Sequence, residues 1–290
     1  MQPVAQKVVT AKGIYRSRGL KGLAIVIPEI LGITRLARRI RRWWNKNDHW
    51  LFGKLVEIRG NRVSIDGCVF EVKSKVVSTP LKSRLALDRY ESAERYAIKE
   101  FLDPGLPVVE FGGGIGVVSC LTNRRLLAPE KHVVVEANPD LVPLIVGNRD
   151  QNGCIFTVVH AALAYGSDEV TFYVDDEFVA SGVQRRTNHA IRVPTVTLGS
   201  ILERFGFERC TLICDIEGGE VELIQIEKSL LGSRVETIIV EVHENVVGRE
   251  SLREMFVELQ RLGFTAIYRH CDTLVLRNER NGATRRQPIR

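Results

Sequence analysis

The chain has 290 residues and a net charge of +6, with 41 Lys or Arg against 35 Asp or Glu. A hydrophobic content of 44% is typical of a soluble globular protein with a sizeable core, and the length suits one large or two small domains. Residues 1–62 carry 14 basic and 3 acidic residues, whereas the remainder carries 27 basic and 32 acidic residues. The positive net charge therefore does not come from residues 63–290.

The basic charge is concentrated in an N-terminal extension, residues 1–50. Within residues 20–44 the apolar stretch is too short and too interrupted by charge for a transmembrane helix, which needs about 20 apolar residues. Apolar residues at steps of three or four alternate there with arginines, which predicts a basic amphipathic helix. Such a helix either packs on the domain or contacts an anionic membrane. Nucleic acid is disfavoured, since two adjacent tryptophans among arginines match no nucleic-acid motif.

Six cysteines are scattered along the chain without a C-x-x-C pair or a Cys/His cluster of zinc spacing. We therefore expect reduced thiols and no metal site. Reduced thiols suit a cytoplasmic protein, and the first 12 residues show no signal-peptide pattern. If the basic helix binds lipid, the protein is peripheral at the inner membrane face.

Residues 51–104 are predicted to form a hairpin and a helix that leads into the core. Residues 54–58 and 69–72 alternate apolar and polar side chains, as paired strands do, with turn residues between them. Residues 84–102 are predicted as one helix that includes Tyr90 and Glu91, and Pro104 and Gly105 end it.

A glycine-rich stretch, residues 108–119, follows as strand, tight turn and helix start. Its glycines remove side chains where a ligand approaches the backbone, and the helix start offers free N–H groups. A dinucleotide loop, G-x-G-x-x-G/A, fails at Val117, which disfavours a nicotinamide enzyme. The pattern is instead acid-x-G-x-G-x-G from Glu110 to Gly116; a glycine turn of another α/β enzyme is the alternative.

Apolar strands then alternate with helices up to residue 278, which predicts a mainly parallel sheet with helices on both faces. The tail, residues 279–290, is predicted to be disordered. The predicted strands include residues 132–136, 156–160, 170–174, 193–196, 211–214, 237–243, 265–268 and 274–276.

Acidic residues and histidines follow successive predicted strands. In a parallel sheet the carboxyl ends of strands meet at one edge, where ligands bind. Each acid alone is equally consistent with a helix cap or a solvated loop residue, but together they predict a site. Glu136 follows Glu110 by 26 residues, close to the ~20-residue spacing at which an acid meets the ribose hydroxyls of an adenosine cofactor. The residues concerned are Glu110, Glu136, His160, Asp215, Glu217, Glu241 and His243.

These motifs resemble, in order, the FkbM-type family of class I S-adenosylmethionine-dependent methyltransferases. The resemblance covers roughly residues 60–277. It implies the Rossmann-like class I methyltransferase fold over residues 105–278, S-adenosylmethionine as cofactor, and O-methylation of a saccharide or of a small-molecule hydroxyl acceptor. The motifs that carry it are residues 108–119, 135–139, 161–163, 196–198, 215–220 and 241–243, and the upstream stretch of Tyr90 and Glu91 also fits the family pattern.

The resemblance also implies site residues. Asp215 and His243 are the candidates for removing the acceptor proton, with Glu217 as a third catalytic candidate. Glu220 and Glu217 have an alternative role as caps of the following helix. The implied cofactor-binding residues are Glu110, Gly112, Gly114, Gly116, Glu136, Asn138 and Ala161.

The sequence departs from the family pattern at several positions. Gly113 and Gly114 replace the common Ala-Asn, Glu110 replaces Asp, and Gly199 replaces an Asp. Ile213 stands where the family often has Lys. These departures leave open a diverged, non-catalytic module that keeps the fold and binds a membrane, glycan or protein partner.

Overall fold

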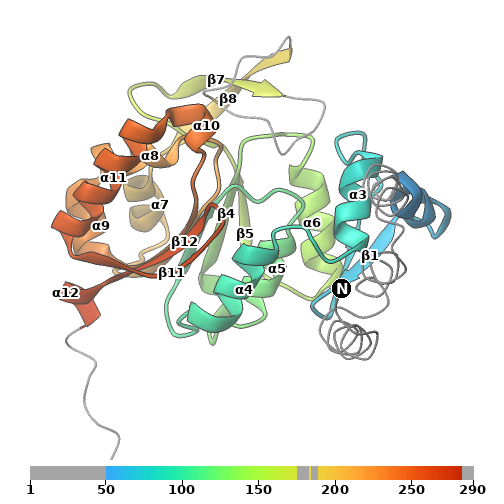
Figure 1. Ribbon diagram of the computed structural model, residues 1–290, viewed down its shortest axis with the longest axis horizontal. Coiled ribbons are helices and arrows are strands. Elements are labelled where there is room, and N and C mark those ends of the chain that lie inside the picture. The colour runs from blue at the N-terminus through green and yellow to red at the C-terminus, as the bar shows by residue number, and fades with distance from the viewer. Residues whose placement is uncertain (1–49, 175–182, 184–188, 283–290) are drawn as a thin grey trace, which may run out of the picture.

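The computed structural model describes residues 50–174, 183 and 189–282 (Figure 1). The predictions for the basic helix of residues 20–44 and for the end of the tail, residues 283–290, lie outside the described residues. Among the described helices, none combines the length and the apolar character that crossing a membrane requires.

The centre of the fold is a seven-stranded sheet in the order β11-β12-β10-β9-β3-β4-β5. Only β12 runs antiparallel to the others. The parallel strands are nearly continuous apolar runs because both of their faces are covered. The strands are β3 (Val108–Phe111), β4 (His132–Glu136), β5 (Thr157–His160), β9 (Cys210–Cys214), β10 (Val235–Glu241), β11 (Phe264–His270) and β12 (Thr273–Asn278).

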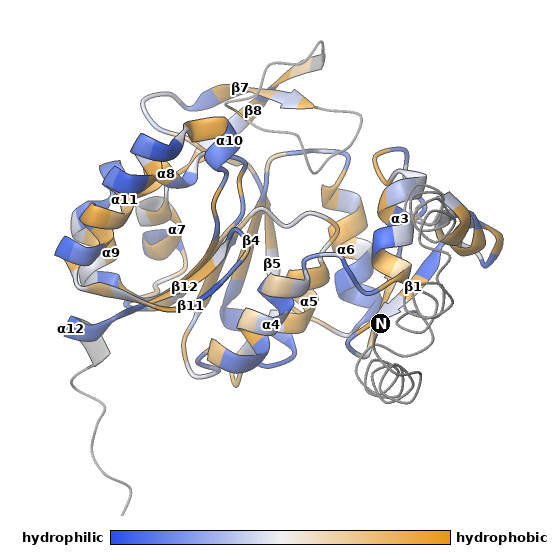
Figure 2. Cartoon of the chain, viewed as in Figure 1, coloured by the Kyte–Doolittle hydropathy of each residue, from blue (hydrophilic) through white to orange (hydrophobic). Residues whose placement is uncertain are grey.

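Helices cover both faces of this sheet (Figures 1 and 2). Val109 and Phe111 of β3 point into one apolar cluster and Val108 into another, since side chains alternate along a strand. Each such buried side chain contributes about 1.5–3 kcal/mol. The first cluster packs on α7 (Leu198–Arg204), α8 (Glu220–Ile226), α9 (Lys228–Arg234) and α11 (Arg249–Leu262). The second cluster packs on α4 (Ser92–Phe101) and α5 (Val117–Asn123).

Four further elements belong to this part of the fold. They are α6 (Val142–Gln151), which lies beside the sheet, and the short elements η1 (Pro129–Lys131), α10 (Glu244–Val247) and α12 (Glu279–Gly282). The prediction of a disordered tail from residue 279 is therefore wrong for α12. This element continues directly from β12, and Asn278 accepts a hydrogen bond from the backbone N–H of Arg280.

The predicted hairpin exists, but its first strand was misplaced. β1 (Arg62–Ile65) pairs with β2 (Cys68–Glu71) around Asp66 and Gly67, whose positive φ values of 50° and 78° suit a tight hairpin turn. Residues 50–58 are helical instead. Packing decides this, because Val56 is buried and Gly53 lies so close to Thr79 that an added Cβ would sit 2.0 Å from its carbonyl oxygen.

The predicted single helix over residues 84–102 is also wrong. The chain forms α3 (Thr79–Ala86) and α4 with a break between them. Asp88 and Glu91 adopt left-handed conformations in this break, with φ of 59° and 46°, and a helix cannot continue through such residues. The break turns Tyr90 and Glu91 toward the carboxyl ends of the central strands.

A second, three-stranded sheet in the order β6-β8-β7 lies over the carboxyl ends of the central strands (Figure 1). It consists of β6 (Ala162–Leu163), β7 (Glu169–Val174) and β8 (His189–Val196). The predicted strands at residues 170–174 and 193–196 belong to this sheet and not to the central one. Phe172 of β7 contributes to the wall of the cavity beneath it.

Candidate active site

A cavity of about 530 Å³ opens at the carboxyl ends of β3, β4, β9 and β10. Its walls also include the break between α3 and α4 and the turn between β11 and β12. This is the edge at which ligands bind in open α/β sheets. Of the predicted site residues, those that line it are Gly112, Gly114, Glu136, Asn138, Ala161, Asp215, Glu217 and His243.

The glycine loop has its conformation for local steric reasons. Gly112, Gly114 and Gly116 have φ of 92°, 54° and 84°, a region that disfavours residues with a Cβ. A Cβ on Gly112 would also lie 1.9 Å from the carbonyl oxygen of Asp215. Gly112 and Gly114 line the cavity, whereas Gly116 starts α5 and does not.

Glu136 ties this loop to the end of β4. Its Oε2 accepts hydrogen bonds from the backbone N–H groups of Gly113 and Gly114, both at 3.0 Å, and its Oε1 accepts one from Asn138 at 2.7 Å. The side chain is almost fully buried. Burial raises the pKa of Glu136 to about 7, although the backbone hydrogen bonds oppose the shift.

Asn138 carries an unused donor at the cavity wall. It is 1% exposed, and its Oδ1 accepts from the backbone N–H of Asp140 at 3.0 Å. Its Nδ2 has no hydrogen-bond partner among the described residues. A buried donor without a partner is costly, so this atom fits a ligand that brings an acceptor. With the glycine turn and the small Ala161 beside it, this wall fits a nucleoside-type cofactor.

Glu110 does not line the cavity, so the structure does not support the cofactor contact predicted for it. Its Oε1 accepts from Ser119 Oγ at 2.5 Å, and its Oε2 lies 3.1 Å from Nε2 of His132. Glu110, Ser119 and His132 are all fully buried. The acid belongs to a polar network inside the protein, because its side chain points under α5 and not out of the strand end.

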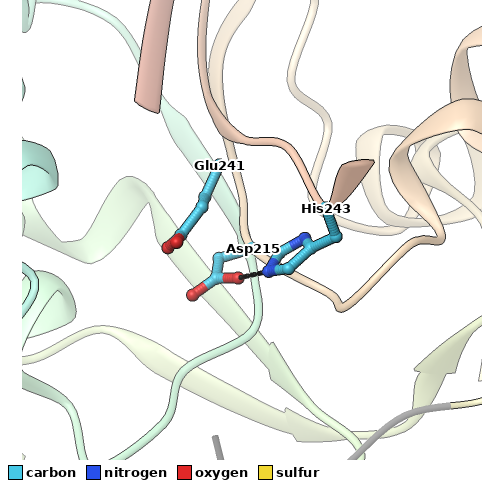
Figure 3. Close-up of side chains that lie close together, drawn as sticks. All are labelled: Asp215, Glu241 and His243. Carbon is cyan, nitrogen blue, oxygen red and sulfur yellow. Dashed lines mark ion pairs between the residues drawn. The ribbon is translucent and has the colours of Figure 1, made fainter. Parts of the chain in front are cut away.

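His243 lies at the opposite end of the cavity, after β10, and is oriented by three carboxylates. Its Nδ1 is 3.1 Å from Oε1 of the fully buried Glu220. Its Nε2 is 3.5 Å from Oδ1 of Asp215 and 3.6 Å from Oε1 of Glu217. Figure 3 shows Asp215 paired with the imidazole, while the carboxylate of Glu241 lies farther from the ring. The structure thus brings the three predicted catalytic residues together.

Glu220 fixes the tautomer of this imidazole. It also accepts from the backbone N–H groups of Ile216 and Gly218, each at 3.0 Å. Because Nδ1 lies closer to Glu220 than Nε2 does to Asp215 or Glu217, neutral His243 carries its hydrogen on Nδ1 and keeps a lone pair on Nε2. That lone pair can accept a proton from a ligand in the cavity.

Burial and closely placed charges shift the pKa values of the groups at this end of the cavity. Burial would lower the pKa of His243, but the hydrogen bond to Glu220 and the nearby negative charges outweigh it, so the pKa is raised. Burial and the charges of Glu241 and Glu91 raise the pKa of Asp215 well above its usual range. Burial also raises the pKa of Glu241 to about 7 and that of Glu91 to about 8.

The same groups could hold a metal ion. One ligand atom each from Asp215, Glu241 and His243 lie within 4.8 Å of one another. An imidazole nitrogen and two carboxylates form a donor set that suits several divalent metals. The sequence predicted no metal site, and that prediction stays untested.

Three acids at this end were missed or given minor roles by sequence reasoning. The sequence predicts Glu91 inside a helix, Glu220 as a helix cap and Glu241 at a strand end without a role. The left-handed conformation of Glu91 and Glu217, with φ of 46° and 53°, is typical of functional sites. The position of Tyr90 and Glu91 in the family pattern was the one available signal.

The departures from the family pattern do not alter the cavity. Ile213 is 4% exposed and packs with Ile98, Ile239 and Val275 in an apolar cluster. Asn tolerates left-handed backbone, so Gly114 and the Asn common in the family fit the same turn. At Gly113 a Cβ would meet only the ends of two side chains, at 2.8 and 2.9 Å.

The strand order, with its one antiparallel strand, and the glycine loop with an acid after the next strand define a class I methyltransferase fold. The sequence matches the Methyltransferase FkbM domain family over residues 110–266, more than half of the chain. The protein therefore belongs to this family. S-adenosylmethionine is its cofactor, and the wall formed by Gly112, Gly114, Asn138 and Ala161 fits it.

Solved structures with similar folds were also found. An O-methyltransferase from Bacillus cereus in complex with SAH is 13% identical, with a TM-score of 0.42, covering 64% of this chain and 79% of that one. A putative transferase from Pyrococcus horikoshii is 12% identical, with a TM-score of 0.41, covering 81% and 85%. A ribosomal protein L11 methylase from Lactobacillus delbrueckii subsp. bulgaricus is 11% identical, with a TM-score of 0.40, covering 65% and 77%. No curated protein matches the sequence.

Proposed function

We propose that the protein is an O-methyltransferase that acts on a hydroxyl of a saccharide, a glycan or a related natural product. The observation that carries the proposal is the orientation of His243. Its Nδ1 is held by Glu220, while Nε2 faces Asp215 and Glu217 in the cavity. A base oriented in this way suits an acceptor that must lose a proton as it reacts.

When bound, S-adenosylmethionine supplies an electrophilic methyl group. The protein has to orient the acceptor oxygen and receive its proton. The proton passes from the hydroxyl to Nε2 of His243, and Glu220 stabilises the resulting imidazolium through Nδ1. Asp215 and Glu217 are positioned to accept hydrogen bonds from the acceptor or from the imidazolium.

The polar character of the cavity supports a polyhydroxylated acceptor. The carboxylic acids Asp215, Glu217 and Glu241 line it, together with Arg84 and Arg89. Carboxylates accept and guanidinium groups donate hydrogen bonds, so several hydroxyls of one sugar find partners. Apolar side chains such as Phe172 offer a surface for the faces of sugar rings.

Transfer of a labelled methyl group to a panel of saccharides, lipid-linked glycans and phenols tests the proposal. His243→Ala should reduce turnover by about 10²–10⁴-fold, the usual contribution of a general base, and leave cofactor binding intact. Asp215→Asn should also reduce turnover more than cofactor affinity. Cofactor binding without methylation of any acceptor would favour the non-catalytic module, and near-normal turnover of both variants would exclude this base.

For its location, we propose a cytoplasmic protein that is peripheral at the inner membrane face through residues 20–44. The support is the sequence itself, since residues 1–49 carry 11 Lys or Arg against 2 Asp or Glu. Deletion of residues 1–48 should reduce binding to anionic vesicles and leave cofactor binding unchanged. Unchanged vesicle binding would contradict this assignment.

A further inference from the structure

The helix of residues 50–58 presents an apolar face to solvent. Leu51, Leu55 and Ile58 follow one another at steps of four and three, which places them on one side of the helix. Their exposed fractions are 53%, 39% and 81%, and that of the adjacent Trp50 is 61%. Scattered apolar residues are normal on a surface, but four on two turns of one helix are a patch.

The opposite side of this helix is anchored, so the orientation of the apolar face is set by the fold. Val56 is buried, and Gly53 packs against Thr79 at the start of α3. Glu57 accepts a hydrogen bond from Thr79 Oγ1 at 2.9 Å and pairs with Lys82 at 3.3 Å. The helix, dark blue in Figure 1 and largely orange in Figure 2, lies at the outer edge of the molecule.

Exposed cations lie beside this helix, since Arg59 directly follows it and Lys73 and Lys75 line one depression together with Glu57. Arg59, Lys73 and Lys75 are exposed and form no ion pair with any described residue. The acids of the same region are already neutralised, since Glu57 pairs with Lys54 and Lys82, and Glu71 lies 3.7 Å from Arg62. The surface therefore combines apolar side chains with unpaired positive charge.

We propose that this surface, formed by Trp50, Leu51, Leu55 and Ile58 with Arg59, Lys73 and Lys75, docks on an anionic membrane. Apolar side chains of an interfacial helix enter the headgroup region, and each nearby cation adds about 1 kcal/mol of attraction to anionic lipid. A second copy of the chain is a poorer occupant, because it would bring the same cations against each other.

The surface consists of folded residues and is distinct from residues 20–44. It adds a fixed orientation, which a basic segment alone does not provide. The helix packs on α3, and Arg84 of α3 lines the cavity. Docking therefore holds the methyltransferase domain on the membrane through the same helix pair that borders the active site. The docking itself does not depend on which acceptor the enzyme methylates.

The test uses the full chain and sedimentation with phosphatidylcholine vesicles that contain or lack phosphatidylserine. The variant Leu51→Glu/Leu55→Glu/Ile58→Glu should lose about tenfold or more of its affinity for the anionic vesicles, although residues 20–44 are intact. Leu127→Glu is the matched control for the Ile58 change, since both side chains are 81% exposed. Circular dichroism and S-adenosylmethionine binding should be the same for both proteins and the wild type.

A second measurement reports on the surface directly. In a Cys271→Ser background, a polarity-sensitive dye on Ile58→Cys should shift to the blue with anionic vesicles, whereas the same dye on Leu127→Cys should not. Wild-type affinity of the triple variant, or no dye shift during vesicle binding, would overturn the proposal. If light scattering shows a dimer for the wild type and a monomer for the triple variant, the face binds a second copy of the chain instead.

Discussion

Nδ1 of His243 lies 3.1 Å from Oε1 of Glu220, a residue 23 positions earlier in the chain and completely buried. Glu220 starts α8, and His243 follows β10, so the contact joins the ends of two neighbouring parallel strands, β9 and β10. It orients the imidazole and raises its pKa. In the proposed mechanism, Glu220 is thus a positioning residue that acts through His243.

Glu220→Gln should lower the pKa of His243, because the variant removes the carboxylate that stabilises the imidazolium. We expect the titration midpoint of His243 to move to lower pH in an NMR titration of labelled histidine. Methyl transfer needs neutral His243. As the pH decreases, activity should therefore be lost at a lower pH in the variant than in the wild type. Glu254→Gln, an exposed change on α11, is the control, and an unchanged His243 titration would show that Glu220 only supports the fold.

Binding of S-adenosylmethionine should strengthen with pH through the ionisation of Glu136. The pKa of Glu136 is about 7, and only its ionised form is a full acceptor for cofactor hydroxyls and loop amides. The affinity from calorimetry should rise about tenfold between roughly pH 6 and pH 8. The Glu136→Gln variant should bind S-adenosylmethionine weakly and with an affinity that does not depend on pH. Glu130→Gln, a change at an exposed residue, should keep the wild-type pH dependence. A wild-type affinity that is flat over this range would contradict the role of Glu136.

Gly112→Ala should destabilise the protein and abolish cofactor binding. The added Cβ would lie 1.9 Å from a backbone oxygen of Asp215, which cannot move without distorting β9. Gly60→Ala is a matched control, since φ is 85° there against 92° at Gly112 and no atom lies within 4 Å of the added Cβ. Thermal unfolding should show a loss of about 1–2 kcal/mol for Gly60→Ala and about 1–3 kcal/mol more for Gly112→Ala. Equal losses would mean that backbone conformation alone requires the glycine.

Glu110→Ala should affect stability and not the cofactor. The change leaves Ser119 and His132 buried without their partner, which costs about 3 kcal/mol. Glu110→Gln keeps an acceptor for Ser119 and should cost less. Chemical denaturation measures both, and calorimetry on the folded variants should give wild-type affinity for S-adenosylmethionine. A selective loss of affinity at full stability would restore the cofactor contact first predicted for Glu110.

Chelation separates two roles for His243. If Nε2 accepts the acceptor proton, methyl transfer should persist in EDTA and should not respond to added Mg²⁺ or Mn²⁺. Activity that is lost in EDTA and restored by one of these ions would instead make Asp215, Glu241 and His243 metal ligands. Calorimetric titration of the protein with each metal ion provides a readout that is independent of activity.

The class of the protein was readable from the sequence because its signals are local. The glycine loop is a strand, turn and helix start within 12 residues, and Glu136 ends one apolar strand while Asp215 directly follows another. Parallel strands align their carboxyl ends, so these positions implied a common site, and all three predicted catalytic residues line one cavity.

Other features depended on which elements pack together. The alternation in residues 54–58 suits a strand, but contact with α3 makes the segment helical. A break at Glu91 follows from backbone conformation that composition does not signal.

The sequence by itself determined the fold class, the cofactor loop and the set of acids at the strand ends. Only the tertiary structure decided the role of each acid. Glu110 and Glu136 both end or nearly end a strand, yet one turns into the core toward His132 and the other holds the glycine loop. The physical reason is that a side chain's role depends on partners far away in the chain, and those partners are known only once the elements have packed.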